Sequence, residues 1–157
     1  MIKVNVVAVG KVKEKYFLDA IEEYKKRLSK FCQLKIIEVK EENFCSEPND
    51  IERLEIMKRE AVSITKELKG YVIALAIEGK KFSSEEFSKT IDRIKNTDSE
   101  ITFVIGGSYG IDQKVKDSAK LKMSFSDMTF PHTLARVMLV EQLYRAFTIS
   151  VDGKYHK

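Results

Sequence analysis

The sequence predicts a parallel α/β fold built as a single domain over residues 1–157. Short apolar runs alternate along the whole chain with longer amphipathic segments, and strands that alternate with helices form parallel sheets joined by crossover helices. Most of these runs are continuously apolar, which is typical of strands covered on both faces. A length of 157 residues suits one domain with its own core.

The first apolar run, Ile2–Val9, is rich in valine and predicts a buried strand. From about Glu14 to Phe31, apolar residues recur at steps of four and three, which predicts an amphipathic helix with basic residues on its outer face. A second strand is expected at Leu34–Val39, followed by a polar loop up to Pro48. The fold therefore begins as strand, helix, strand.

Two capping boxes mark the starts of the next two helices. Asn49 stands three residues before Glu52, a spacing that lets the side chain and backbone of each exchange hydrogen bonds. Ser83 and Glu86 repeat this spacing. The first of these helices is expected to end at Gly70 and to bury one apolar stripe, made of Ile51, Leu54, Met57, Ala61, Ile64 and Leu68.

The remaining strands lie between and after these helices. Tyr71–Ile77 is almost wholly apolar and predicts a central strand, with a turn at Glu78–Lys81. Ile101–Ile105 predicts another buried strand, and Leu121–Phe125 a fifth. Asp112 is expected to cap a short helix between these two.

The final segment, from His132 to about Ile149, contains no helix breaker and is apolar on nearly every side. A helix of this kind is expected to be buried all round, yet Arg136, Glu141 and Arg145 lie within it. Glu141 and Arg145 have the spacing of an intrahelical ion pair. Arg136 has no acid three or four residues away, so we expect it to face a ligand.

The candidate binding site lies at the carboxyl ends of the strands, where parallel sheets bind their ligands. Three segments leave such ends: Leu75–Glu78, Gly106–Gly110 and Phe125–Phe130. The glycine loop among them matches neither the dinucleotide fingerprint nor a phosphate loop. It is either a tight turn or a place where bare backbone approaches a ligand closely.

Composition narrows the class of protein. The formal charge is +4, a mild excess that is compatible with an RNA partner. No apolar run reaches the length of a membrane span, and the N-terminus lacks the layout of a signal peptide. The two cysteines, Cys32 and Cys45, have no metal-ligand spacing. We therefore expect a cytoplasmic protein without a bound metal and without a membrane partner.

The chain resembles the RlmH family, the pseudouridine N3-methyltransferases of large-subunit ribosomal RNA, which belong to the SPOUT class with a trefoil knot. The residues that carry the resemblance are Phe103–Gly107, Leu134–Val137 and the closing Tyr155–Lys157. Ala8–Lys11 and Glu78–Lys80 extend it over the rest of the chain. The resemblance implies an α/β knot, in which the C-terminal segment of about residues 101–150 is threaded through a loop.

The resemblance also implies a cofactor and a partner. S-adenosylmethionine would sit in the knot and be held largely by backbone groups of Leu75, Gly106, Gly107, Phe125, Ser126, Asp127, Met128, Thr129 and Phe130. The protein would be a homodimer with a shared active site, whose last helix packs on its twin through Leu139, and whose tail completes the partner's site. Relatives often carry an acid where this chain has Ala76.

The implied substrate is the 23S rRNA of the assembled ribosome, methylated at N3 of a pseudouridine in helix 69. N3 must lose a proton, which Tyr155 or His156 would accept. Arg136 or Arg145 would stabilise the anionic base, and His132 either faces the substrate or caps its helix. No metal is needed, because a sulfonium is already an activated electrophile.

Two other functions remain open on the sequence. The glycine loop would also suit a non-catalytic, nucleotide-binding regulatory domain in which the tail is idle. A hydrolase that uses His132 and Glu141 is a weaker alternative, because no nucleophile lies at a strand-to-helix elbow.

Overall fold

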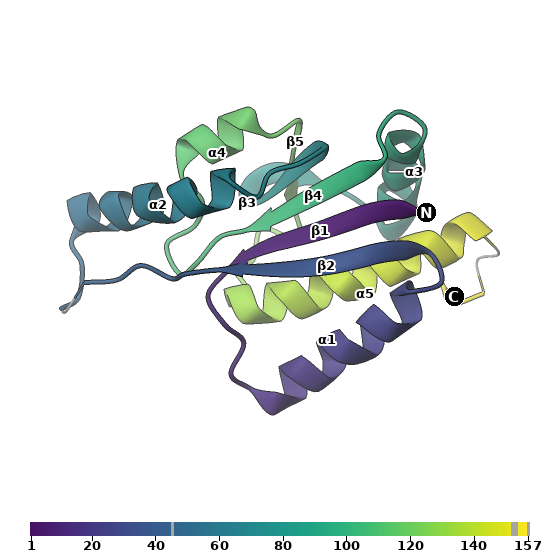
Figure 1. The fold of residues 1–157 in the computed structure, drawn as a ribbon, viewed down its shortest axis with the longest axis horizontal. Helices are drawn as coiled ribbons and strands as arrows, with labels where there is room; N and C mark the ends of the chain where they lie inside the picture. The colour runs from purple at the N-terminus through teal and green to yellow at the C-terminus, as the bar shows by residue number, and fades with distance from the viewer. Residues whose placement is uncertain (45, 152–153, 157) are drawn as a thin grey trace.

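Five parallel strands form one sheet with helices on both of its faces (Figure 1). The structure, a computed structural model, describes residues 1–44, 46–151 and 154–156, so that Cys45 and Lys157 lie outside the described residues. The strand order is β2-β1-β4-β3-β5. The elements are β1 Ile2–Val9, α1 Lys15–Leu28, β2 Cys32–Val39, α2 Asp50–Thr65, β3 Tyr71–Lys81, α3 Ser84–Lys95, β4 Glu100–Ile105, α4 Gln113–Ser118, β5 Leu121–Ser124 and α5 His132–Val151.

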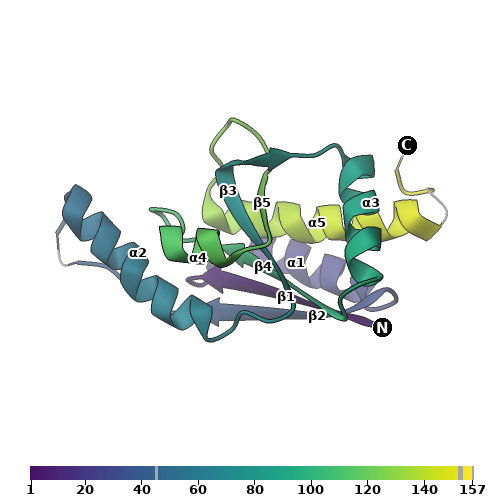
Figure 2. The same ribbon diagram turned by 90° about the horizontal axis from the view of Figure 1, so that it is seen from above.

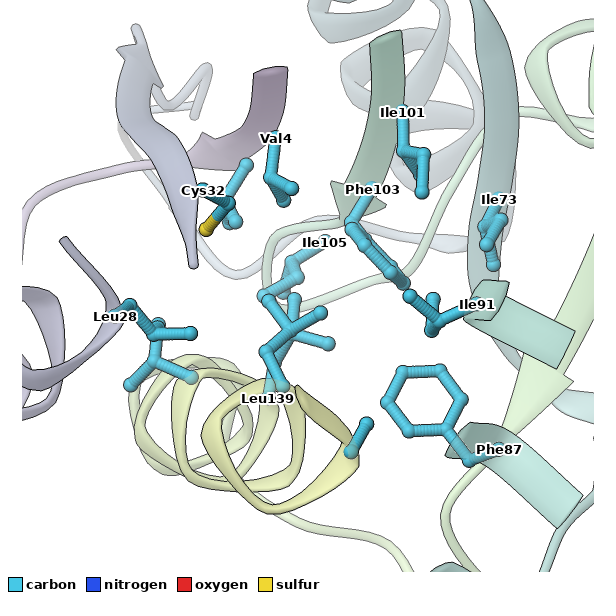
Figure 3. Close-up of a cluster of buried hydrophobic side chains, with 14 of the residues drawn as sticks. Val4, Leu28, Cys32, Ile73, Phe87, Ile91, Ile101, Phe103, Ile105 and Leu139 are labelled. Carbon is cyan, nitrogen blue, oxygen red and sulfur yellow. The ribbon is translucent and has the colours of Figure 1, made fainter. Parts of the chain in front are cut away.

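The central strands are apolar throughout because both of their faces are covered. α1, α3 and α5 lie on one face of the sheet, and α2 and α4 lie on the other (Figures 1 and 2). In β1, Val4 and Val6 face the first group of helices and Val7 faces the second. Figure 3 shows Phe103 of β4 pointing toward Ile91 of α3, within the larger of the two cores.

The parallel α/β architecture confirms the prediction from the alternating pattern. Both capping boxes are present, at Asn49 and Ser83, and the Asp112 side chain accepts a hydrogen bond from the Lys114 backbone at 2.9 Å at the start of α4. Within the described ranges, no helix is both long and apolar enough to cross a membrane. The threading of the C-terminal segment through a loop stays a prediction.

The turn predicted at Glu78–Lys81 is wrong, because β3 continues to Lys81. Its pairing with β5 shifts register between Leu75 and Lys80. Gly79 sits within this irregularity, and a Cβ there would lie 2.6 Å from the backbone nitrogen of Met123. The glycine therefore marks a close approach between two strands, not a chain reversal.

The apolar stripe predicted for α2 is partly wrong. The helix ends at Thr65, before Gly70, and Ile51 and Leu54 are 78% and 61% exposed. Figures 1 and 2 show the reason, since the first half of α2 extends past the carboxyl edge of the sheet. Only its second half, with Ile56 and Ile64, packs on the strands.

The last helix, α5, runs antiparallel to the strands. It begins beneath their carboxyl ends and finishes near the N-terminus of β1 (Figure 1). Burial is not complete all round, as Val137, Met138 and Tyr144 are half-buried. Leu139 is fully buried in the core beneath the sheet, so it cannot form a seam with a second chain (Figure 3).

Candidate active site

The carboxyl ends of β3, β4 and β5 surround a cavity of about 750 Å³. The structure therefore brings together the three segments that the sequence indicated. The lining includes nearly all the residues predicted to hold a cofactor: Leu75, Gly106, Gly107, Phe125, Ser126, Met128, Thr129 and Phe130. His132 and Ala135 close the cavity from the first turn of α5, and Lys116 and Tyr109 contribute from the α4 side.

The glycine loop is a tight turn that also presents bare backbone to the cavity. The backbone nitrogen of Gly110 donates to the carbonyl of Gly107 at 3.1 Å, and Gly110 adopts a φ of +94°. A Cβ on Gly106 would lie 2.7 Å from the carbonyl carbon of Gly110. The loop is therefore a tight turn that depends on the missing side chain at Gly106 and on the left-handed backbone at Gly110, whereas the approach of a ligand to its backbone stays a prediction.

Two serine hydroxyls shape the loop after β5. The Ser124 Oγ donates to the Ser126 carbonyl at 2.9 Å, and the Ser126 Oγ accepts from the Met128 backbone at 3.1 Å. This local turn directs the backbone of the loop along the cavity. Asp127 is the one predicted cofactor residue that is not part of the lining; its carboxylate pairs instead with Lys81.

An ion pair lies at the rim of the cavity. The Lys116 Nζ approaches the Glu78 Oε1 at 2.8 Å, and its hydrogen bond lowers the pKa of the Glu78 carboxyl below the ordinary value. Glu78 is the acid nearest in sequence to Ala76. In this arrangement its charge is directed to Lys116.

Arg136 is buried and joins α5 to the carboxyl ends of β1 and β2. Its Nη1 donates to the Glu38 Oε2 at 2.7 Å and its Nη2 to the Gly10 carbonyl at 3.1 Å. Its Nε has no hydrogen-bond partner within the described part of the chain. The reason for expecting Arg136 to face a ligand therefore fails, because its acid partner is Glu38 of β2, 98 residues away.

The tail residues form a second cluster with the end of α5. The Glu141–Arg145 ion pair is present at 2.5 Å, as its spacing predicted. The Tyr155 hydroxyl donates to Glu141 at 3.2 Å. The His156 Nδ1 lies 3.2 Å from an Arg145 nitrogen, and its Nε2 lies 2.7 Å from the Glu85 Oε1.

The cavity lies at the start of α5, whereas the cluster lies along the second half of the same helix. Arg145 is 13 residues beyond His132 in α5, which corresponds to about 20 Å along the helix axis. One chain therefore does not bring Arg145, Tyr155 and His156 to its own cavity. The structure also does not bring together His132 and Glu141, the pair predicted for a hydrolase. His132 lines the cavity, whereas Glu141 is bound by Arg145 and Tyr155.

Glu60 is a residue near the site that sequence analysis missed. It is only 2% exposed, on α2 beside Gly107, and its Oε2 accepts from the Glu42 backbone at 3.1 Å. Burial, together with the charges of Glu41 and Glu42, raises the pKa of its carboxyl to about 7. Its spacing of four from both Ile56 and Ile64 was the available signal, because these two form the buried face of the helix.

A parallel sheet with a backbone-lined cavity at its carboxyl edge is compatible with a nucleotide-type cofactor site. The family model described as "Predicted SPOUT methyltransferase" matches residues 2–156. A protein of Streptococcus equi subsp. zooepidemicus named ribosomal RNA large subunit methyltransferase H is 49% identical, over 99% of each chain. A Methanococcus vannielii protein named putative ribosomal RNA large subunit methyltransferase H is 48% identical, over 98% of this chain and 99% of its own. The chain belongs to the ribosomal RNA large subunit methyltransferase H family of SPOUT methyltransferases.

Solved structures show the same fold at low sequence identity. A probable methylase family protein from Haemophilus influenzae superposes with a TM-score of 0.55 and 12% identity, over 100% of this chain and 72% of its own. The tRNA (m1G37) methyltransferase of Aquifex aeolicus gives 0.54 and 12%, over 99% and 75%. At this identity the likeness concerns the fold alone.

Proposed function

We propose that this protein transfers a methyl group from S-adenosylmethionine to N3 of a pseudouridine in helix 69 of 23S rRNA, within assembled ribosomes in the cytoplasm. The single observation that carries the proposal is the backbone-lined cavity at the ends of β3, β4 and β5. The full-length relatives named as ribosomal RNA large subunit methyltransferases support the RNA substrate.

The cavity fits the proposed cofactor. Its volume of about 750 Å³ lies within the usual range for cofactor pockets. Apolar walls from Leu75 and Phe125 would enclose an adenine ring, and the main chain at Gly106 and Gly107 would supply hydrogen-bonding groups at close range. S-adenosylmethionine, when bound, supplies a methyl group on a positively charged sulfur.

The tail cluster would handle the proton and the charge of the acceptor base. The pKa of Tyr155 is raised to about 12 by its hydrogen bond with Tyr24 and by burial, so its phenol stays protonated and acts as a donor. His156 is therefore the stronger candidate to accept the N3 proton, with Glu85 at its Nε2 to orient the ring. The proton would go to Nδ1, from which the Arg145 guanidinium would turn to stabilise the N3 anion as it forms. Arg136 is buried and bonded to Glu38 and Gly10, so it would act only by holding α5 against β1 and β2.

A homodimer would unite the two halves of this site. An isologous interface pairs a surface with itself, and α5 is 20 residues long, so that an antiparallel α5 pair centred near Glu141 places the end of each helix beside the start of the other. The half-buried Val137 and Met138 face a groove of about 370 Å³ on this part of α5 and would supply the seam. His132, at the start of α5, would then face the substrate across from the partner's tail.

The proposal includes the trefoil knot over about residues 101–150 in a single domain of residues 1–157. α4 and α5 lie on opposite faces of the sheet, so the chain passes from one face to the other around β5 (Figure 2). This crossing supports a threaded path. A threaded chain is expected to refold far more slowly than a βα crossover of equal length.

The decisive experiment is mass spectrometry of nucleosides from helix 69. Ribosomes from a strain without the gene are incubated with the purified protein and S-adenosylmethionine, and free 23S rRNA serves as the matched control. N3-methylpseudouridine should form on the ribosomes alone. Binding of the cofactor without methylation of either substrate would instead support a non-catalytic regulatory domain, and no cofactor binding in calorimetry would refute the methyltransferase.

Complementation tests the shared site. A chain lacking residues 155–157, of which Lys157 lies outside the described residues, is co-expressed with a Gly106→Val chain. Half of the dimers are then mixed and each carries one intact site, so activity should return to about a quarter of wild type. Activity that remains absent in the mixture, while each chain still dimerises, would place the tail's role within its own subunit.

A further inference from the structure

A second hollow, of about 390 Å³, lies between the C-terminal half of α1, the end of α5 and the tail. We call it the α1–α5 groove. Its lining residues come from α1 and the turn after it, from α5 and from the tail. The ends of these helices converge near the start of β1, away from the carboxyl ends of the strands (Figure 1). Of its lining, the function proposed above uses Tyr155 and no other described residue.

The groove carries a strong positive charge. Among the residues that the structure describes, four cations line it against the acid Glu23: Lys26, Arg27, Lys30 and Lys154. The Arg27 Nε already pairs with the Glu23 carboxylate at 3.0 Å, so this negative charge is compensated inside the groove. A hollow that concentrates cations in this way attracts a polyanion, and the attraction is strongest inside the concave surface.

The groove also presents flat aromatic surfaces. Its lining includes the rings of Phe31, Tyr144 and Tyr155. The Arg27 guanidinium lies over the Tyr144 ring, 5.7 Å from its centroid, and Tyr155 meets the same ring edge-on at 4.8 Å. Arg27 is thereby held as a planar platform at the groove wall, with 42% of its side chain exposed.

We infer that the α1–α5 groove binds a single-stranded stretch of the RNA substrate, with phosphates on Lys26 and Lys30 and one unstacked base on the Arg27–Tyr144 platform. Sites for single-stranded nucleic acid combine a cationic track with stacking side chains in this way. An acidic protein would need the cations but not the planar surfaces. The inference rests on the proposed function in one respect, namely that the nucleic acid is RNA.

The position of the groove fits this role. Tyr155 lines the groove and belongs to the tail that would complete the partner subunit's site. In the proposed antiparallel dimer, a strand lying in the groove would therefore lead directly to the nucleotide being methylated. Binding energy gained there would position the target base without any separate RNA-binding domain.

The charge component is tested with a double variant and a matched control. Lys26→Gln/Lys30→Gln removes two exposed cations from the groove, and Lys58→Gln/Lys66→Gln removes two exposed cations from α2 and its C-cap on the opposite face of the sheet. Binding of fluorescein-labelled octauridylate is followed by anisotropy between 50 and 200 mM KCl. The groove variant should bind about tenfold more weakly at low salt, and the slope of the logarithm of its binding constant against the logarithm of the KCl concentration should be shallower by about 1.4. The control should match wild type in both.

The stacking component is tested with Arg27→Lys, which keeps the charge and loses the plane. Affinity for octauridylate should fall about fivefold or more, while the salt dependence stays at the wild-type value. An abasic oligomer of the same length should bind the wild type and this variant equally. If Arg27→Lys binds both ligands with the wild-type affinity, the Arg27–Tyr144 surface does not stack a base.

The outcomes separate this inference from the function on which it rests. The RNA measurements need no cofactor. If no methylation is seen and the groove variants still bind octauridylate more weakly than wild type, the proposed methyl transfer is refuted and RNA binding in the groove is supported. If Lys26→Gln/Lys30→Gln methylates ribosomes with the wild-type KM and its octauridylate binding is unchanged, RNA binding in the groove is refuted. Displacement of octauridylate by polyaspartate of equal charge at equal concentration would assign the groove to an acidic protein and overturn the RNA assignment.

Discussion

The substitution Glu60→Gln should make the protein more stable at neutral and alkaline pH. Glu60 is 2% exposed and lies beneath the glycine loop, where its carboxylate oxygens are 3.3 and 3.4 Å from the place a Cβ of Gly107 would occupy. One backbone N–H, from Glu42, is the hydrogen bond recorded for its carboxylate in the described residues. Burial and the neighbouring Glu41 and Glu42 raise its pKa from 4.5 to about 7.

The size and sign of the effect follow from this difference in pKa. Below pH 4.5 the carboxyl is protonated in both the folded and unfolded chains and contributes no difference. Between pH 4.5 and 7 the unfolded chain is ionised while the folded chain retains the proton, so the free energy of unfolding falls as the pH rises. Above pH 7 the full cost applies, which is about 3 kcal/mol for a pKa raised from 4.5 to about 7.

Urea unfolding at several pH values measures the effect. The chain contains no tryptophan, so far-UV circular dichroism is the appropriate probe, at one protein concentration because any dimer makes stability concentration-dependent. The free energy of unfolding of Glu60→Gln minus that of wild type should grow by about 2–3 kcal/mol from pH 4.5 to pH 8. Glu22→Gln, an exposed site on α1, is the control and should show a constant difference.

A flat difference across this pH range would refute the reasoning. It would mean that the Glu60 carboxylate is hydrated or paired when folded, and so has an ordinary pKa. A difference that grows in the opposite direction would mean that the ionised form stabilises the glycine loop.

Three further predictions follow from single contacts. Gly106→Ala should weaken S-adenosylmethionine binding in calorimetry by about tenfold or more, because its Cβ would meet the Gly110 backbone at 2.7 Å. The control Gly110→Ala has open space and should cost only about 1 kcal/mol of stability, from its φ of +94°. Equal binding by both variants would contradict this prediction. Arg136→Met should lower the free energy of unfolding by about 2 kcal/mol, because it removes the hydrogen bonds to Glu38 and Gly10. The loss is limited because Glu38 is 39% exposed and can be rehydrated. An unchanged free energy of unfolding in urea would show that the ion pair is energetically neutral. Met138→Glu should yield monomers in sedimentation analysis, while the exposed Lys89→Glu control should stay dimeric. Dimers in both variants would place the interface between subunits away from α5.

The regular elements could be predicted because each one depends on neighbours close in sequence. The buried strand β1 and the capping box at Ser83 are local patterns, and the structure contains both. The errors arise where tertiary position decides. Ile51 has the correct helical spacing, but α2 extends beyond the sheet there, and Gly79 resembles a turn residue although it serves a strand contact.

The same distinction applies to the candidate site. The rule that ligands bind at the carboxyl ends of parallel strands was sufficient to collect the three segments that line the main cavity. The partner of Arg136 was not predictable, since Glu38 lies on β2 and pairing across 98 residues leaves no periodic signal. The buried Glu60 was missed because charged residues are expected on the exposed face of an amphipathic helix.

In the proposed homodimer, the separation of the cavity from the tail cluster should make activity depend on the association of two subunits. Glu141 holds Arg145 and Tyr155, and His156 is held by Arg145 and Glu85, so the cluster is one unit on the second half of α5. Its Arg145 lies about 20 Å along the helix from His132. If the site forms only between two subunits, specific activity should fall on dilution in step with dimer dissociation measured by sedimentation, whereas S-adenosylmethionine affinity should not change, because the cavity belongs to one chain. Specific activity that stays constant below the dissociation constant of the dimer would show that a single subunit contains the complete site.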